Sequence, residues 1–488
     1  MSSRNSNKLF ARTDLRGWLD DIETLGELKH LRGADWNKEI GTLVELNAKA
    51  RGPALLFDEI RGYPAGFRIL AGAMSGSKRL GLTLGFPPDL EGLDLIRFMK
   101  DKMHQWRDHV EDFPAVETAD GVIFQNVDKN QSVDLLKFPS PIWHEEDGGR
   151  YIGTGSVAIM RDPDTGWVNL GTYRMMVHDK VSTGLFIAPR HHGRVIMEKY
   201  WARGEPCPIA VSAGHHPIIL FAGSLAVPTG VSEYNYIGSV IGENVPIVRG
   251  RATGLPIPAF SEIALEGFMH PGDFQTEGKF GEWPGYYVSE AKPEPVMRVT
   301  AVYYRDDPIL LGAWPGRPPH DTTYRNSIIK SASLWELLDR AGIRGVIGVY
   351  RPEAGSANLL TVVGIKQMFA GHARQVGTVA SQLLSHPTRY VIVVDDDIDI
   401  TNLEDILWAV CTRTDPSRSI TIIDDIHVNV LDTMVRSRFD ERAGHTGSCA
   451  VIDACKPYRT LAKFPKVAES SPEFKKMVRD KWSGLLKL

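Results

Sequence analysis

The last third of the chain alternates short apolar runs with helical segments, and this alternation narrows the fold more than any other feature. After Pro318 and Pro319, segments such as GTVASQLLS and LEDILWAVCTR separate runs rich in β-branched residues. Such runs are typical of strands covered on both faces. Strands that alternate with helices in this way predict an α/β domain. The runs are RGVIGVY, NLLTVVGI, RYVIVVD and SITIIDD.

Two further helices are predicted in this part of the chain. SLWELLDRAG opens with a capping box formed by Ser333 and Glu336 and ends at Gly342. The segment SPEFKKMVRDKWSGLLKL has Pro472 in its first turn and carries an apolar stripe. The stripe suits packing either on a neighbouring subunit or on its own chain. Its members are Phe474, Met477, Val478, Trp482 and Leu485.

Residues 120 to 330 differ, because strand-like runs dominate and Gly, Pro, Asp and Asn interrupt them at short intervals. This pattern predicts an antiparallel sheet or barrel, with one helix at HGRVIMEKYWARG. The first hundred residues mix helices, at DLRGWLDDIETLGEL and LDLIRFMKDKMHQW, with a strand at PALLFDEI. The strand-like runs of the central region are VIFQNV, TGSVAIM, WVNLGTYRMMVH, STGLFIA, PIAVSA, MRVTAVYY and PILLGAW.

The composition argues against several kinds of partner. A formal charge of -4 gives no reason to expect nucleic acid or an anionic membrane. No apolar run approaches the roughly 20 residues of a membrane helix, and MSSRNSNKLFARTDLRGW lacks the apolar middle of a signal peptide. We therefore expect a cytoplasmic protein. The cysteines match no zinc spacing and are expected to be free thiols; they are Cys207, Cys411, Cys449 and Cys455.

Residues 276–287, TEGKFGEWPGYY, place Glu277 and Glu282 among glycines and aromatic rings. Burying an ionised carboxylate is costly unless it is paired or its pKa moves. A perturbed pKa of this kind suits a proton donor that works near neutral pH. The stretch is therefore a candidate acid/base element.

A candidate partner lies upstream, in WVNLGTYRMMVHDK. This predicted strand places Arg174 between Tyr173 and Met175, in apolar company. An arginine there needs an anion, and its planar fork suits a carboxylate. The anion is either Glu277, in a buried pair, or the carboxylate of a substrate. Both interpretations hold together if the pair also orients the substrate.

Histidine, asparagine and glutamate side chains suggest a metal site. IAPRHHGR carries His191 and His192, GVSEYNYIG carries Glu233, and Asn169 shares the predicted strand with Arg174. An oxygen-rich set with a single histidine suits Mn²⁺ or Mg²⁺ better than zinc. The alternative is that these are ordinary hydrogen-bonded residues. The GHH at 214–216 is a weaker candidate, because neighbouring histidines on a strand point to opposite faces.

The run VVDDDIDI, with Asp395 to Asp397 and Asp399, follows an apolar strand-like run. Strand ends often carry sites in open α/β sheets, but we interpret the aspartates first as a solvated turn. No G-x-G-x-x-G after a strand, no Walker A pattern and no G-x-S-x-G elbow is present. Nucleotide hydrolysis and serine-hydrolase chemistry are therefore disfavoured.

Five motifs together resemble the UbiD family of decarboxylases, which use prenylated FMN. In this order and spacing they are NLGTYRMMVHDK, TGLFIAPRHH, SLAVPTGVSEYNYIG, SEIALEG and TEGKFGEWPGYY. DDDIDI and LEDILWAVCTR extend the resemblance into the C-terminal third. It implies an α+β and α/β multidomain fold: an N-terminal α/β domain (1–120), a split-barrel flavin domain (121–325) and a C-terminal α/β domain with an oligomerisation helix (326–488).

The resemblance also implies roles for individual residues. Arg174, Glu277 and Glu282 match the family's catalytic set. Asn169, His191 and Glu233 match the ligands of a divalent ion, manganese or magnesium, that bridges the protein to the flavin phosphate. Ala222 and Ser224 lie where backbone oxygens hold a potassium ion. The implied cofactor contacts are Asn169, Gly171, Thr172, Tyr173, Arg174, Arg190, His191, Gly223, Ser224 and Glu233.

The function implied is a reversible, non-oxidative decarboxylation of an aromatic or heteroaromatic carboxylic acid. Arg174 would position the carboxylate, Glu277 would pair with Arg174, and Glu282 would protonate the carbon that loses CO₂. A separate flavin prenyltransferase would supply the cofactor, and a homodimer or a hexamer of dimers is implied.

Other readings remain open. Arg190 stands where cinnamate-type members carry glutamine, which weakens but does not remove an alternative substrate class, cinnamic-type α,β-unsaturated acids. His320, in WPGRPPHD, lies either in a hinge or against the substrate. A different class, a metal-dependent hydrolase or isomerase, would use the metal without flavin. A non-catalytic flavin-binding protein is the third reading, and the buried charges of Arg174 and its glutamates argue against it.

Overall fold

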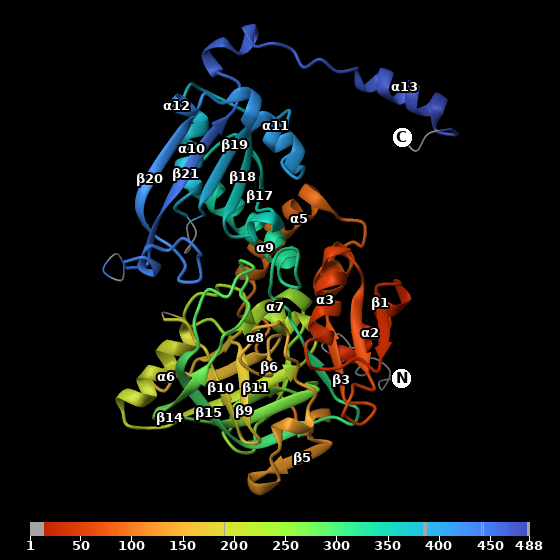
Figure 1. The fold of residues 1–488 in the computed structure, drawn as a ribbon, viewed down its shortest axis with the longest axis vertical. Helices are drawn as coiled ribbons and strands as arrows, with labels where there is room; N and C mark the ends of the chain where they lie inside the picture. The colour runs from red at the N-terminus through yellow and green to blue at the C-terminus, as the bar shows by residue number, and fades with distance from the viewer. Residues whose placement is uncertain (1–13, 190, 384–387, 441, 443, 486–488) are drawn as a thin grey trace.

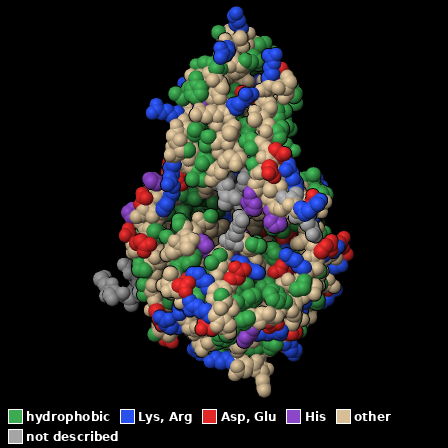
Figure 2. Space-filling model, turned by 90° about the vertical axis from the view of Figure 1, so that its left-hand side faces the viewer, with side chains coloured by type: hydrophobic (Ala, Val, Ile, Leu, Met, Phe, Trp, Pro, Cys, Tyr) green, Lys and Arg blue, Asp and Glu red, His purple; other side chains and the backbone are tan. Residues whose placement is uncertain are grey.

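The computed structural model describes residues 14–189, 191–383, 388–440, 442 and 444–485, so Arg190 lies outside the described residues. Figure 1 shows a curled central sheet in the lower part of the molecule, a second sheet above it, and the N-terminal elements at one side. On the face seen in Figure 2, basic and acidic side chains are interspersed.

The N-terminal sheet contains a strand from far along the chain. Its order is β1-β2-β3-β16, and β16 pairs parallel to β3. PILLGAW, predicted in the central sheet, therefore belongs to this one, and the prediction was wrong. The helix at DLRGWLDDIETLGEL is confirmed as α2, with Asp14 as its N-cap. The elements are α2 (Leu15–Thr24), β1 (Leu28–Arg32), α3 (Glu39–Lys49), β2 (Ala54–Asp58), β3 (Arg68–Ala71), α4 (Ser77–Leu84), α5 (Gly92–Asp108) and β16 (Ile309–Leu311).

The predicted central antiparallel sheet is confirmed. Its order is β6-β9-β10-β15-β14-β11-β7-β8, with β5 added on β15, and every pair is antiparallel. Only part of VIFQNV is a strand, since residues 122–124 form a 3-10 turn. The strands are β5 (Asn126–Lys129), β6 (Tyr151–Gly153), β7 (Val157–Arg161), β8 (Val168–Gly171), β9 (Met175–Asp179), β10 (Ser182–Gly184), β11 (Cys207–Gly214), β14 (Ile263–Glu277) and β15 (Lys292–Tyr304).

The connection between β8 and β9 curls this sheet. WVNLGTYRMMVHDK is not one strand, as predicted, but two, separated by residues 172–174. β8 lies at one end of the strand order and β9 next to the other end. Because so short a link joins them, the two ends of the sheet must approach each other, which gives the half-barrel seen in Figure 1. This link, residues 172–174, is here called the seam, and Arg174 is its last residue.

The central region holds more helices than the single one predicted at HGRVIMEKYWARG. α7 is buried along its whole length, so its sequence PIILFAG lacks the polar face that distinguishes a helix from an apolar strand. α8 begins after Ser232, whose side chain accepts a hydrogen bond from the Tyr234 amide. The remaining elements are α6 (His192–Ala202), α7 (Pro217–Gly223), α8 (Glu233–Ile241) and a small sheet of β4 (Val116–Glu117), β12 (Pro246–Arg249) and β13 (Pro256–Pro258).

The C-terminal α/β domain is confirmed as a five-stranded sheet of order β17-β18-β19-β21-β20. β18, β19 and β21 are parallel neighbours, whereas β20 is an antiparallel, partly exposed edge strand and not a covered one. The elements are α9 (Thr323–Arg340), β17 (Val346–Tyr350), β18 (Leu360–Ile365), α10 (His372–Ala380), β19 (Tyr390–Asp395), α11 (Leu403–Arg413), α12 (Pro416–Ser419), β20 (Ile420–His427), β21 (Thr446–Ala454) and α13 (Pro472–Trp482).

Of two predictions about side chains in this domain, one was wrong and the other holds in part. The capping box does not form, because α9 begins before it and the hydroxyl of Ser333 donates to the carbonyl of Ile329 inside the helix. The aspartates at the end of β19 match the predicted solvated turn only in part, because Asp396 and Asp399 are exposed but two others are paired. Arg413 pairs with Asp395 at 3.1 Å and with Asp397 at 2.7 Å. This network fixes the strand end.

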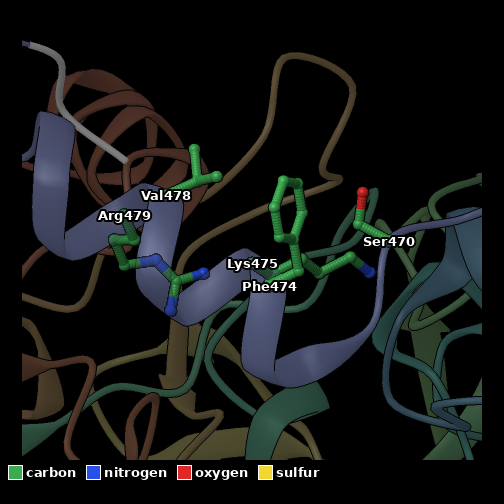
Figure 3. Close-up of a pocket in the computed structure, with 5 residues that line it drawn as sticks. All are labelled: Ser470, Phe474, Lys475, Val478 and Arg479. Carbon is green, nitrogen blue, oxygen red and sulfur yellow. The ribbon is translucent and has the colours of Figure 1, made fainter.

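Beyond the domain, residues 464–485 form an exposed segment, here called the C-terminal arm. No residue of α13 is buried, and the helix stands off the body (Figure 1), so packing of its stripe on its own chain is ruled out. The arm carries a hollow of its own (Figure 3), lined by Ser470, Phe474, Lys475, Val478 and Arg479. The cysteines are free, as predicted, with only Cys411 exposed.

Candidate active site

The structure brings Arg174 between the two predicted carboxylates. Its Nε and Nη2 donate to Glu277 at 2.9 and 2.8 Å, a two-pronged pair, and its Nη1 donates to Glu282. The Arg174 side chain is 8% exposed and that of Glu277 is fully buried. Glu277 is the last residue of β14, and Glu282 lies in the loop that follows. The seam and this loop therefore meet at one point.

Three aromatic residues complete the cluster. The hydroxyl of Tyr151 donates to Glu277 Oε1 at 3.0 Å. The guanidinium of Arg174 lies over the rings of Phe186 and Phe280, at 4.3 and 5.4 Å from their centroids, where the ring quadrupoles attract a cation. No role was predicted for Tyr151 or Phe186, because nothing in their local sequence separates them from core residues.

The cluster perturbs proton affinities in the direction expected for an acid/base site. Burial raises the pKa of Glu282 to about 7, with Arg174 opposing and Glu277 adding to the rise. Burial alone would lower the pKa of Arg174, but the two carboxylates outweigh it and hold the pKa above its ordinary value. Glu282 can therefore carry a proton near neutral pH while Arg174 stays charged.

The glycines of TEGKFGEWPGYY allow the loop to lie close to its neighbours. Gly285 has a φ of +88°, and a Cβ there would come within 2.7 Å of the Arg317 Cα. On the same loop, the carbonyl of Trp283 faces the Nε2 of His320 at 3.3 Å. His320 is buried, which lowers its pKa to about 4 and keeps the ring neutral. It therefore contacts the residue next to Glu282.

Asn169 and Glu233 form a second polar cluster. Asn169 Nδ2 donates to Glu233 Oε1 at 2.9 Å, and the Leu170 amide donates to Oε2 at 2.7 Å. Burial raises the pKa of Glu233 to about 7 despite these bonds. The Oδ1 atom of Asn169 is buried without a hydrogen-bond partner. An orphan oxygen beside a buried carboxylate fits a divalent cation, because both would be its ligands.

His191, the third predicted ligand, lies at the N-cap of α6. Its ring is 6.2 Å from that of Tyr173, and the Tyr173 hydroxyl accepts a hydrogen bond from the Gly193 amide at 3.1 Å. Burial and His192 lower the pKa of His191, which favours the neutral imidazole that binds metals. In the described part of the chain, no three His, Cys, Asp or Glu side chains gather closely enough to hold a metal.

The weaker histidine pair at 214–216 is accounted for by packing. His215 Nδ1 lies 2.9 Å from the Ser212 hydroxyl, and His216 Nδ1 accepts from the Ile218 amide at the start of α7. Burial lowers both pKa values to about 3. These are neutral core histidines.

The remaining predicted cofactor contacts lie around the seam and the end of α7. Gly171 ends β8, and a Cβ there would come within 2.4 Å of the Tyr173 hydroxyl. A Cβ on Gly223 would lie 3.7 Å from Thr172, so the two segments adjoin. Ser224 donates to the carbonyls of Leu220 and Phe221, and Ala222 is fully buried. The backbone carbonyl of Ala222 accepts from the Leu225 amide.

Comparison with known proteins identifies the family. Profiles of the 3-octaprenyl-4-hydroxybenzoate carboxy-lyase match in three parts: its N-terminal domain at residues 19–99, its Rift-related domain at 115–318 and its C-terminal domain at 323–454. The chain is 31% identical over 419 residues to the pyrrole-2-carboxylic acid decarboxylase of Pseudomonas aeruginosa, which covers 83% of each protein. A mixed α+β fold with three matched parts defines a carboxy-lyase. The chain belongs to the UbiD family.

Solved structures of UbiD-class enzymes and of a decarboxylase have the same fold as this chain. The UbiD-class enzyme HmfF from Pelotomaculum thermopropionicum, in complex with FMN, superposes with a TM-score of 0.85 at 28% identity, over 97% of this chain and 100% of that one. An evolved dimeric form of HmfF in complex with prFMN gives 0.82 at 27% identity, with the same coverage. The vanillic acid decarboxylase of Sedimentibacter hydroxybenzoicus, in closed form, gives 0.80 at 25% identity, over 97% and 99%.

Family membership decides between the enzyme classes considered above. The chain is a carboxy-lyase, which sets aside both the flavin-free hydrolase and the non-catalytic protein. No helix among the described residues combines the length and the apolar character needed to cross a membrane.

Proposed function

We propose that this protein catalyses the reversible, non-oxidative decarboxylation of an aromatic or heteroaromatic carboxylic acid with prenylated FMN. The observation that carries the proposal is the buried Arg174 held between Glu277 and Glu282. Burying three ionisable groups costs stability, so their presence together in the core favours a functional role over a structural one. The names of the relatives support the substrate class, since they include decarboxylases of pyrrole-2-carboxylic acid and of vanillic acid.

Arg174 positions the substrate carboxylate in this proposal. Its guanidinium already makes a two-pronged pair with Glu277, which with Tyr151 fixes the plane of the fork. The Nη1 atom points to Glu282, so a substrate carboxylate at Nη1 would lie beside the proton donor. When bound, prenylated FMN supplies the electron sink that carbanion formation requires. The proton on Glu282 then neutralises the carbon that has lost CO₂.

Asn169, His191 and Glu233 would hold manganese or magnesium against the flavin phosphate. The orphan Oδ1 of Asn169 and the raised pKa of Glu233 support a cation there, since its charge would stabilise the carboxylate. Backbone oxygens near Ala222 and Ser224 would hold potassium. Gly171–Arg174, Gly223 and His191 would contact the flavin, and a flavin prenyltransferase would supply it.

Within the class, cinnamic-type acids are the second candidate. We propose aryl and heteroaryl acids first, because the curated relative is a pyrrole-2-carboxylic acid decarboxylase. His320 would serve as the hinge contact between α9 and the loop of Glu282.

We also propose three units, 1–120, 121–325 and 326–488, in a cytoplasmic homodimer or hexamer. The strand β16 crosses from the second unit into the sheet of the first. The exposed stripe of the C-terminal arm supports a subunit contact, because large apolar side chains left in water favour burial against a partner.

The test is co-expression with a flavin prenyltransferase, followed by mass spectrometry of the bound cofactor and assay against a panel of aryl, heteroaryl and cinnamic acids. We expect prenylated FMN and CO₂ release from at least one aryl or heteroaryl acid. The variant Glu282→Gln should retain the cofactor and lose turnover. Its matched control is Glu290→Gln, a carboxylate after the same loop that is 84% exposed. Turnover by the loaded Glu282→Gln protein at the wild-type rate would contradict the proposed role.

A further inference from the structure

The segment 144–148 faces the loop that carries Glu282, and its central contact is made by Asp147. The Asp147 side chain is fully buried. Its Oδ1 accepts from the amide of Gly281 at 3.0 Å, and its Oδ2 accepts from the amide of His144 at 3.0 Å. One carboxylate therefore joins two backbone segments, and one of the amides it holds belongs to the residue just before Glu282.

The ring of His144 contacts this carboxylate. Its Nδ1 lies 3.0 Å from Asp147 Oδ2, and its Nε2 lies 2.5 Å from the carbonyl of Pro315. One ring nitrogen thus faces the Asp147 carboxylate and the other the carbonyl of Pro315, which fixes the orientation of the ring. The ring also lies close against the loop, because a Cβ on Gly281 would come within 2.8 Å of His144 Nδ1.

Two more hydrogen bonds join segment 144–148 to the loop of Glu282. The Gly148 amide donates to the carbonyl of Lys279 at 2.8 Å, and the Glu146 amide donates to the Tyr287 hydroxyl at 2.9 Å. Segment 144–148 therefore holds the loop both before and after Glu282. Since an error of about 1 Å in the placement of a reacting group can cost about a hundredfold in rate, this seating bears directly on proton delivery.

We propose that Asp147 and His144 are positioning residues: Asp147 fixes the Gly281 amide, His144 fixes Asp147, and together they hold the Glu282 carboxyl at Arg174. The inference rests on the proposed function of Glu282 as proton donor. Asp147 acts through the backbone amide of Gly281, and His144 acts through Asp147 and through its ring, which packs edge-on against that of Phe280 with 5.7 Å between centroids.

The first experiment measures hydrogen–deuterium exchange of the full-length protein without cofactor. In Asp147→Asn an NH2 group replaces one carboxylate oxygen, so the amides of Gly281 and His144, which donate to different oxygens, cannot both keep their acceptor. Loss of a hydrogen bond to a charged group predicts exchange faster by roughly tenfold in peptides that span 278–287. The control is Asp134→Asn. Asp134 likewise accepts a hydrogen bond from a backbone amide (Leu136, 3.0 Å) and has a charged partner (Lys180, 3.0 Å), and its substitution should leave exchange in 278–287 unchanged. Unchanged exchange in 278–287 would overturn the proposal.

The second experiment separates positioning from stability. In loaded Asp147→Asn and His144→Gln, we expect kcat to fall by about ten- to a hundredfold while KM and flavin content stay near wild type. His144→Gln leaves the carboxylate in place and serves if Asp147→Asn does not fold. Parallel loss of flavin and of thermal stability, with kcat per flavin unchanged, would reduce both residues to a structural role. If Glu282→Gln were active, the proposed function would fail instead, whatever the exchange data gave.

Discussion

The proton on Glu282 gives the sharpest prediction, because its loss with rising pH can be followed directly. Burial raises the pKa of this carboxyl to about 7. The protonated form exists on the acid side of that value, and kcat/KM reports the pKa values of the free enzyme, so kcat/KM for decarboxylation should fall as the pH rises through 7. Between pH 6 and pH 8 the protonated share drops from about 90% to about 10%, a decrease of about tenfold. The assay is kcat/KM of the loaded enzyme, measured at substrate concentrations below KM.

The neighbours of Glu282 shape this titration. Arg174 and Glu277 face it, so the observed pKa belongs to the cluster of three groups. Glu290→Gln should reproduce the wild-type profile, since that carboxylate is 84% exposed and pairs with Lys279 at 3.5 Å. Glu282→Gln should lose at least about a hundredfold in kcat at every pH. A kcat/KM that stays flat or rises from pH 6 to pH 8 would refute the assignment of Glu282 as the acid.

Three other perturbations have defined outcomes. Arg174→Met leaves the buried Glu277 carboxylate with Tyr151 as its partner, so the free energy of unfolding should fall by about 3–5 kcal/mol. Calorimetry should show a lower Tm, and the double variant Arg174→Met/Glu277→Met should partly restore it. An unchanged Tm in Arg174→Met would contradict the pairing. Glu233→Gln removes the charge beside the orphan Asn169 oxygen, so bound manganese and flavin should both fall, measured by elemental analysis and absorbance, whereas His192→Ala should keep both. Deletion of the C-terminal arm should reduce the molar mass of the oligomer measured by light scattering. An unchanged mass would show that the arm does not hold the subunits together.

Much of the fold could be predicted from local patterns, and the errors lie where pairing is long-range. The helix α2 and the strand β2 (Ala54–Asp58) follow from apolar spacing. The sequence PILLGAW also predicts a strand, but its partner is β3, more than two hundred residues upstream. Periodicity reports which face of a strand is buried and not which strand lies beside it. The break at 172–174 was missed for a similar reason, since sheet curvature decides it.

The candidate site divides in the same way. Glu277 and Glu282 were predicted because two charges among glycines and rings are locally anomalous, and Arg174 because its neighbours are apolar. Tyr151 lies 126 positions from Glu277, and its hydrogen bond was not predictable from either segment. Asp147 was missed as well, since an aspartate in HEEDGG is an ordinary residue of a turn until the loop of Glu282 packs on it.

The two glutamates differ in how fully Arg174 satisfies them, and this difference assigns their roles. Glu277 receives both Nε and Nη2 of the arginine and the hydroxyl of Tyr151. Protonating it would break a two-pronged ion pair, so it is suited to holding the guanidinium in place. Glu282 shares only Nη1, and burial raises its pKa to about 7. A substrate carboxylate that took over Nη1 would remove this last charge partner and raise the proton affinity of Glu282 further, so binding itself would load the donor with the proton it must give.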